Sequence, residues 1–333
     1  MEVKNSNRKI IYSLELLRFI LCFWVVVHHC CRNANKFKGR FHVPTFMIMS
    51  FYFYYNILKT KNITKIKQRF QRILIPYIIW AIFIFFFNNL LFKLFGFILI
   101  KTKLQLKDLL LQLIFGSHYN LIFYYLFNLL FLTLLFNIIS FLFPKNFISL
   151  YLALLIVAYF FQYSYWDIFI LKKYFRVIQF SLGLIFELLP YAVVGVILYY
   201  LDIVTKLKKY KEVSIFFLGE IIFLILKFDI FVIIKGFLYP GILPNVGGIC
   251  IFILFSLFSF LNRKLIFLLK IITKYTGGIY YLHMICFKFL SRAFIFIRKK
   301  TFHGSIVIYI TTYIICYFGN KSSSKTKLKY LFN

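Results

Sequence analysis

Apolar residues along the chain gather into long blocks, which short polar or basic segments separate. Ten blocks stand out, with approximate limits 10–31, 44–58, 73–98, 120–143, 147–166, 178–201, 213–234, 245–261, 277–297 and 304–319. Most contain roughly 15–25 residues, the length at which a helix crosses the hydrocarbon core of a bilayer. The pattern predicts an all-α polytopic membrane protein, with about ten transmembrane helices in one bundle.

Composition agrees with a membrane protein. Of the 333 residues, 62% are hydrophobic and 23% aromatic, well above the usage of soluble domains. The first apolar block lacks a signal-peptide cleavage pattern, so we expect it to remain as a span. No internal repeat or separate soluble domain is found, and we predict one membrane domain over 1–320, followed by a basic polar tail over 321–333.

The formal charge of +32, from 41 Lys+Arg and 9 Asp+Glu, would suggest nucleic acid in a soluble protein. Here the basic residues lie mostly between apolar blocks, where they orient helices and contact anionic head groups. No nucleic-acid-binding motif is present, so the lipid bilayer is the expected partner and nucleic acid is not. The basic segments 59–72, 206–211 and 263–274, which are expected to be loops, favour a cytoplasmic N-terminus.

The six cysteines lie in or at the ends of apolar blocks: Cys22, Cys30, Cys31, Cys250, Cys286 and Cys316. None has zinc-ligand spacing, and their positions do not indicate a disulfide framework. Buried thiols that act as small apolar side chains are expected instead. Because the histidines are scattered and acids are few, we predict no metal site.

The first block carries polar residues inside the apolar run LRFILCFWVVVHHC, residues 17–30. Polar groups in a membrane helix are costly and usually face a protein interior, a water-filled cavity or a substrate. On a helix, Arg18 and His29 lie within about 20° of the same face and about 16 Å apart along the axis, whereas His28 is about 80° away. Glu15 can pair with Arg18 at i, i+3. The alternative places both polar positions at the membrane interfaces, among the lipid head groups.

The sequence LELLRFILCFWVVVHHC, with Glu-x-x-Arg followed by ten residues and His, resembles the first helix of the acyltransferase 3 family of integral membrane O-acyltransferases. Further segments resemble the family in chain order: VPTFMIMSFYF at 43–53, QRFQRILIPYIIW at 68–80, LPYAVVGVILYY at 189–200 and YTGGIYYLHMICF at 275–287. Two departures are Phe51, where the family has glycine, and the segment HYNLIFYYL from His118, which lacks the family's tryptophan.

The resemblance implies transfer of an acyl group, most simply acetyl, from acyl-CoA to a hydroxyl of a cell-surface polysaccharide or glycolipid sugar. A neutral histidine can take the proton of an attacking hydroxyl, so His29 is the expected general base. An arginine fork binds phosphate or polarises a carbonyl. We therefore expect Arg18, oriented by Glu15, near the CoA thioester, and Arg69 and Arg72 at the CoA phosphates.

The remaining family motifs suggest the acceptor site. His118, Tyr280 and His283 are the residues that the resemblance implies there, although a structural role is the other interpretation of both histidines. Arg69 and Arg72 have the alternative role of positive-inside anchors. Acetyl-CoA is expected as a donor substrate, with no permanently bound cofactor.

Similar proteins imply a multi-pass location in a bacterial cytoplasmic membrane, with donor and acceptor in different compartments. We accordingly expect the bundle to enclose a central water-accessible cavity lined by Arg18 and His29, with Cys22 and Val25 on the face between them. Two other classes compete with an enzyme: a transporter or flippase, and a non-catalytic membrane component of polysaccharide export. A transporter often shows internal repeats, which this sequence lacks.

Overall fold

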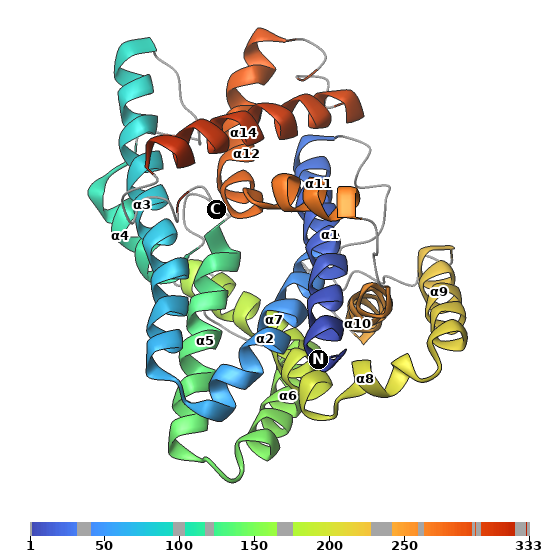
Figure 1. Ribbon diagram of the computed structural model, residues 1–333. Coiled ribbons are helices and arrows are strands. Elements are labelled where there is room, and N and C mark those ends of the chain that lie inside the picture. Colours follow the sequence, from blue (N-terminus) through green and yellow to red (C-terminus); the bar gives the residue numbers. More distant parts are fainter. Residues whose placement is uncertain are drawn as a thin grey trace. The chain divides into compact units, whose positions relative to one another are not determined.

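In the computed structural model the described residues are 2–31, 41–95, 104–116, 123–164, 176–227, 242–258, 263–294, 297, 301–323 and 331. Every regular element within these ranges is a helix (Figure 1). The helices are α1 (Glu2–Cys30), α2 (His42–Thr60), α3 (Ile63–Phe95), α4 (Leu106–Phe115), α5 (Tyr124–Leu142), α6 (Phe147–Ser164), α7 (Arg176–Tyr200), α8 (Ile203–Lys208), α9 (Lys211–Lys227), α10 (Ile242–Leu257), α11 (Arg263–Thr273), α12 (Thr276–Ala293) and α14 (Phe302–Ser322).

Each predicted apolar block falls largely on one of these helices, which confirms the all-helical class. Five stretches of the described chain are long and apolar enough to cross a bilayer: Tyr12–Cys30, Ile63–Leu94, Tyr124–Leu142, Gly183–Tyr200 and Phe302–Ser322. Helices α6 and α10 carry shorter apolar stretches, Phe147–Phe160 and Val246–Leu257. These helices support a multi-pass membrane protein, while the number of about ten spans stays a prediction.

Three short helices, α4, α8 and α11, lie where the sequence analysis expected only connecting segments. Helix α4 begins where the backbone N–H of Gln105 donates to the Asp108 carboxylate at 2.7 Å. It ends at Gly116, which has a φ of 74° and donates its N–H to the carbonyl of Gln112. A glycine suits this left-handed position, because other residues adopt it at a cost.

The chain forms two compact units. Unit 1 comprises Met1–Phe53, Val194–Ile234 and Tyr239–Asn333, and unit 2 comprises Tyr54–Val193 and Lys235–Leu238. In unit 1, α1 packs against α10, α11, α12 and α14, and α12 also packs along α14. In unit 2, α3 packs against α4 and α5, and α5 packs against α6.

Helix packing in unit 1 includes a very close contact between α2 and the end of α7. A Cβ atom added to Gly195 would clash with the carbonyl oxygen of Ile48. That clash shows that the two backbones touch at Gly195. Small residues that allow such an approach stabilise helix pairs in membranes through van der Waals contact, since lipid provides little hydrophobic drive.

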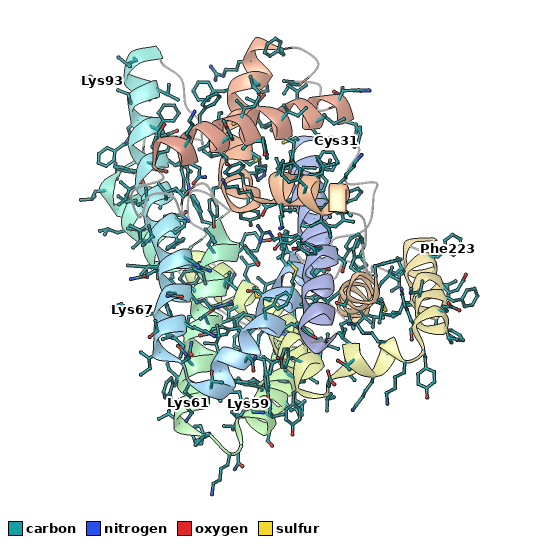
Figure 2. The ribbon with its side chains drawn as sticks, viewed as in Figure 1. Cys31, Lys59, Lys61, Lys67, Lys93 and Phe223 are labelled. Carbon is teal, nitrogen blue, oxygen red and sulfur yellow. The ribbon has the colours of Figure 1, made fainter. Side chains whose placement is uncertain are left out.

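The exterior carries large apolar side chains with charges near helix ends. In unit 1, Phe223 of α9 points away from the neighbouring helices (Figure 2) and is 55% exposed. In unit 2, Lys67 and Lys93 lie near opposite ends of the 33-residue helix α3, and both are exposed (Figure 2). Apolar surface between two charged ends is typical of a membrane span.

Candidate active site

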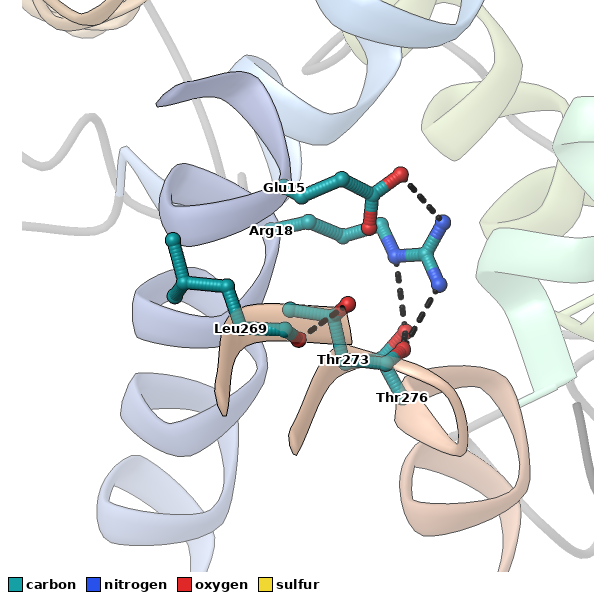
Figure 3. A network of polar contacts seen from close by, with 5 residues as sticks. All are labelled: Glu15, Arg18, Leu269, Thr273 and Thr276. Carbon is teal, nitrogen blue, oxygen red and sulfur yellow. Dashed lines mark hydrogen bonds and ion pairs between the residues drawn. The ribbon is translucent and has the colours of Figure 1, made fainter. Parts of the chain in front are cut away.

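Arg18 lies on α1 and contacts the junction between α11 and α12 in unit 1. Its Nε–H donates to Thr276 Oγ1 at 2.7 Å, and Nη2 donates to the carbonyl oxygen of Thr273 at 2.8 Å (Figure 3). Its Nη1 pairs with Glu15 Oε1 at 3.4 Å, which confirms the predicted i, i+3 pair. The guanidinium is therefore fixed from two sides, by its own helix and by the junction.

The sequence around Thr273 explains why this junction attracts a cation. Helix α11 ends at Thr273, and the last carbonyls of a helix carry a partial negative charge. The Thr276 hydroxyl donates to that same Thr273 carbonyl at 3.1 Å, so its lone pairs are left to accept from Arg18. Thr273 in turn donates its own hydroxyl to the Leu269 carbonyl at 2.8 Å (Figure 3).

Arg18 remains partly accessible despite these contacts. A guanidinium has five N–H donors, and the three bonds above use only three of them. The side chain of Arg18 is 35% exposed and that of Glu15 is 32% exposed. The arrangement suits a positioned cation that can still contact a ligand, as well as one that ties α1 to α11 and α12.

The helix face between Arg18 and His29 differs from the sequence-based expectation. Cys22 and Val25 are each only 1% exposed. The Cys22 thiol donates to the Thr276 carbonyl at 3.4 Å, because α12 packs directly against this part of α1. The prediction that these two positions line a water-accessible cavity is therefore wrong for unit 1.

The histidine pair at the end of α1 divides between two environments. His29 is exposed, and its ring centroid lies 5.4 Å from that of His283 on α12. His28 is half-buried, and its ring lies 5.4 Å from that of His42 at the start of α2. Of the two histidines, only His29 is both exposed and close to His283, a residue that the family motifs also indicate.

His283 is fully buried, with 0% exposure. Its Nδ1 lies 2.8 Å from the carbonyl oxygen of Tyr280 and 3.1 Å from that of Ile279. The Tyr280 ring lies 6.2 Å from the His283 ring. The structure therefore brings together His29, His283 and Tyr280, whereas His118 lies outside the described residues.

Arg69 and Arg72 belong to unit 2 and lie one turn apart on α3. The Arg69 guanidinium lies over the ring of Tyr54, 4.0 Å from its centroid, and its Nε–H donates to Thr133 Oγ1 at 3.2 Å. The Tyr54 hydroxyl oxygen accepts a hydrogen bond from Asn137 Nδ2 at 2.7 Å. Arg72 is exposed. Arg69 is thus built into a polar cluster of α2, α3 and α5, and Arg72 is available to a ligand.

Several buried polar side chains in spans were not singled out from the sequence, and Glu187 and Asn128 are two of them. Glu187 on α7 is 3% exposed, and Asn128 on α5 is 1% exposed. Neither amide atom of Asn128 has a hydrogen-bond partner in the described part of unit 2. The sequence could have indicated both as candidate functional residues, since each is a polar residue within an apolar block.

The six cysteines are all buried, as the sequence predicted, and none is in a disulfide bond. Among the described residues, no group of three His, Cys, Asp or Glu side chains could hold a metal ion.

Comparison with known proteins gives one result. A family model described as an acyltransferase domain matches residues 11–320, nearly the whole chain and parts of both units. No curated protein and no solved structure matches the chain.

Proposed function

We propose, from the premise that this chain belongs to the acyltransferase 3 family, that it is a membrane-bound O-acyltransferase. The donor is an acyl-CoA, most simply acetyl-CoA, and the acceptor is a hydroxyl of a cell-surface polysaccharide or glycolipid sugar. The observation that carries the proposal is the pairing on α1 of an anchored, partly accessible Arg18 with an exposed His29 beside His283.

His29 is the general base of this proposal. Its neutral ring takes the proton from the acceptor hydroxyl while the oxygen bonds to the acyl carbon, and the bond from that carbon to the CoA sulfur breaks. The departing thiolate takes up a proton, which the His29 imidazolium can supply. A positioned base of this kind contributes about 10²–10⁴-fold to a rate.

Arg18 serves the donor. Its charge, held in place by Glu15, Thr273 and Thr276, suits polarisation of the acyl carbonyl as negative charge develops on the oxygen. Arginine keeps its proton in any such environment, so it acts as a fixed electrophile and not as an acid.

The CoA phosphates fit the basic end of α3. Exposed Arg72 and the half-buried Arg69 lie in the last turn of the basic segment 59–72, for which the charge bias favours the cytoplasmic side. For the acceptor side of the reaction, we assign the residues that the family motifs suggest: His118, Tyr280 and His283. The proposal includes a bacterial cytoplasmic membrane as the location, with the N-terminus on the inner side, where acyl-CoA is available.

The test compares two neighbouring histidines. His29→Ala should lower acetyl transfer by at least about 100-fold, while His28→Ala, at the ring beside His42, should retain most of it. The measurement is base-labile acetate on surface carbohydrate of cells that express each variant at equal level. Equal loss of acetyl transfer from both substitutions would contradict the role of His29. A separate assay on the purified wild-type protein tests the two other classes, because a transporter or a non-catalytic component would release no CoA thiol from acetyl-CoA.

A further inference from the structure

The buried histidine on α12 has one ring nitrogen that nothing in the described chain satisfies. The Nε2 atom of His283 is enclosed and has no hydrogen-bond partner in the described residues. A buried polar atom without a partner destabilises the folded protein, because it has lost its bond to water. Such an atom in a folded protein needs an explanation, and a role in binding or chemistry is one of them.

The other ring nitrogen determines what Nε2 can do. Both atoms near Nδ1 are backbone carbonyl oxygens, of Ile279 and Tyr280, and these can only accept. A neutral His283 therefore carries its proton on Nδ1 and has a lone pair on Nε2. The helix backbone fixes this tautomer, so Nε2 acts as a hydrogen-bond acceptor.

His29 is the group placed to donate to that lone pair. Its ring centroid lies 5.4 Å from that of His283, and the two planes are inclined by 35°. Two imidazoles that share a linear N–H to N bond have centroids about 5 Å apart, given hydrogen-bond lengths near 3 Å. The observed separation of the two centroids is therefore compatible with such a bond.

We propose that His283 is a positioning residue that accepts a hydrogen bond from His29 through Nε2. The inference rests on the proposed function, because it assigns His29 as the base. With one His29 nitrogen committed as a donor to His283, the other presents its lone pair to the acceptor hydroxyl. When His29 takes the hydroxyl proton, it becomes an imidazolium and still donates its hydrogen bond to Nε2 of His283. His283 stays neutral, and its Nδ1–H still donates to the carbonyl oxygens on α12.

The experiment uses three variants of the full chain in detergent. His283→Leu removes the acceptor, and His283→Gln retains one in its side-chain oxygen. His303→Leu is the matched control, because His303 is an exposed histidine at the start of α14 in unit 1. The chain has only six histidines, so nitrogen-15 spectra of labelled histidine can be assigned by substitution.

The first readout is the tautomer of His29, which requires no activity. One tautomer is expected in the wild type, His283→Gln and His303→Leu, and a mixture in His283→Leu. The second readout is acetyl transfer, with a loss of about 100-fold in turnover for His283→Leu, recovery to within about 10-fold for His283→Gln, and unchanged acetyl-CoA affinity.

Two outcomes would overturn the inference. One is a His29 spectrum that His283→Leu leaves unchanged. The other is a loss of turnover that His283→Gln does not relieve although the protein is folded and binds acetyl-CoA. If the wild type transfers no acetyl group, the proposed function fails, and the His29 spectrum still decides whether His283 holds that ring.

Discussion

Arg18 in unit 1 and Arg69 in unit 2 are both arginines within candidate membrane spans, but their surroundings differ. Arg18 contacts a carboxylate, a hydroxyl and a carbonyl at a helix end. Arg69 contacts an aromatic face and a hydroxyl. The first set includes a formal negative charge and the end of a helix dipole, whereas neither contact in the second carries a charge.

The difference indicates two uses of the same side chain. Carboxylate and carbonyl contacts fix the direction of the Arg18 fork and compensate part of its charge. A ring face supports the Arg69 cation through its quadrupole without cancelling the charge. Arg18 is thus suited to act on one defined atom, and the Arg69–Arg72 turn is suited to attract an anion such as a phosphate.

The largest expected effect comes from Arg18 itself. Arg18→Gln should lower turnover by at least about 100-fold, the loss typical when one positioned donor to a developing oxyanion is removed. Arg18→Lys should not restore activity, because an ammonium cannot reproduce the fork. Acetyl-CoA turnover by purified protein measures both. Arg292→Gln, at an exposed arginine of α12, is the control and should remain active.

A smaller effect, of a different kind, is expected at the basic end of α3. Arg72→Gln should raise the KM for acetyl-CoA about 10-fold, with a lesser change in kcat, because an exposed phosphate contact adds binding before the chemistry begins. Lys67→Gln is the control, since Lys67 is exposed on the same helix. A drop in kcat at unchanged KM would contradict phosphate binding and favour a role in membrane orientation.

The smallest effect tests how strongly the junction holds Arg18. Thr276→Val removes the acceptor of the Nε–H bond and leaves the Thr273 carbonyl and Glu15 in place. Hydrogen bonds between side chains in membrane proteins are worth about 0.6 kcal/mol on average, which corresponds to a roughly 3-fold loss of turnover. Thr276→Ser should be neutral. A loss as large as that of Arg18→Gln would show that Thr276 takes part in the reaction itself.

The long apolar helices and the local pairs on them were predictable from the sequence, whereas the short helices α4, α8 and α11 were not. Apolar blocks locate the spans because every backbone polar group in lipid must bond within its own helix. Glu15 and Arg18 are three residues apart, so their pairing follows from helix geometry alone. The division between His28 and His29 followed from the same geometry together with the family motif.

What the sequence did not predict depends on contacts between distant segments. The burial of Cys22 and Val25 arises because α12 packs on the face that links Arg18 to His29. Helical periodicity identifies that face but does not indicate whether water or another helix covers it. The tautomer of His283 was equally hidden, since it follows from the position of carbonyl oxygens around its ring.

The bonds around Arg18 also impose an order of assembly during synthesis. Its partner Thr276 follows 258 residues later in the chain. At 5–20 residues per second, a ribosome needs roughly 13 to 50 s to cover that distance. During this interval α1 must enter the membrane with its guanidinium lacking both threonine contacts, and Glu15 on the same helix is the partner already present. Glu15 can therefore compensate the charge of Arg18 before the later helices are made, and a chain that stops before α11 and α12 would lack the other two contacts of this guanidinium.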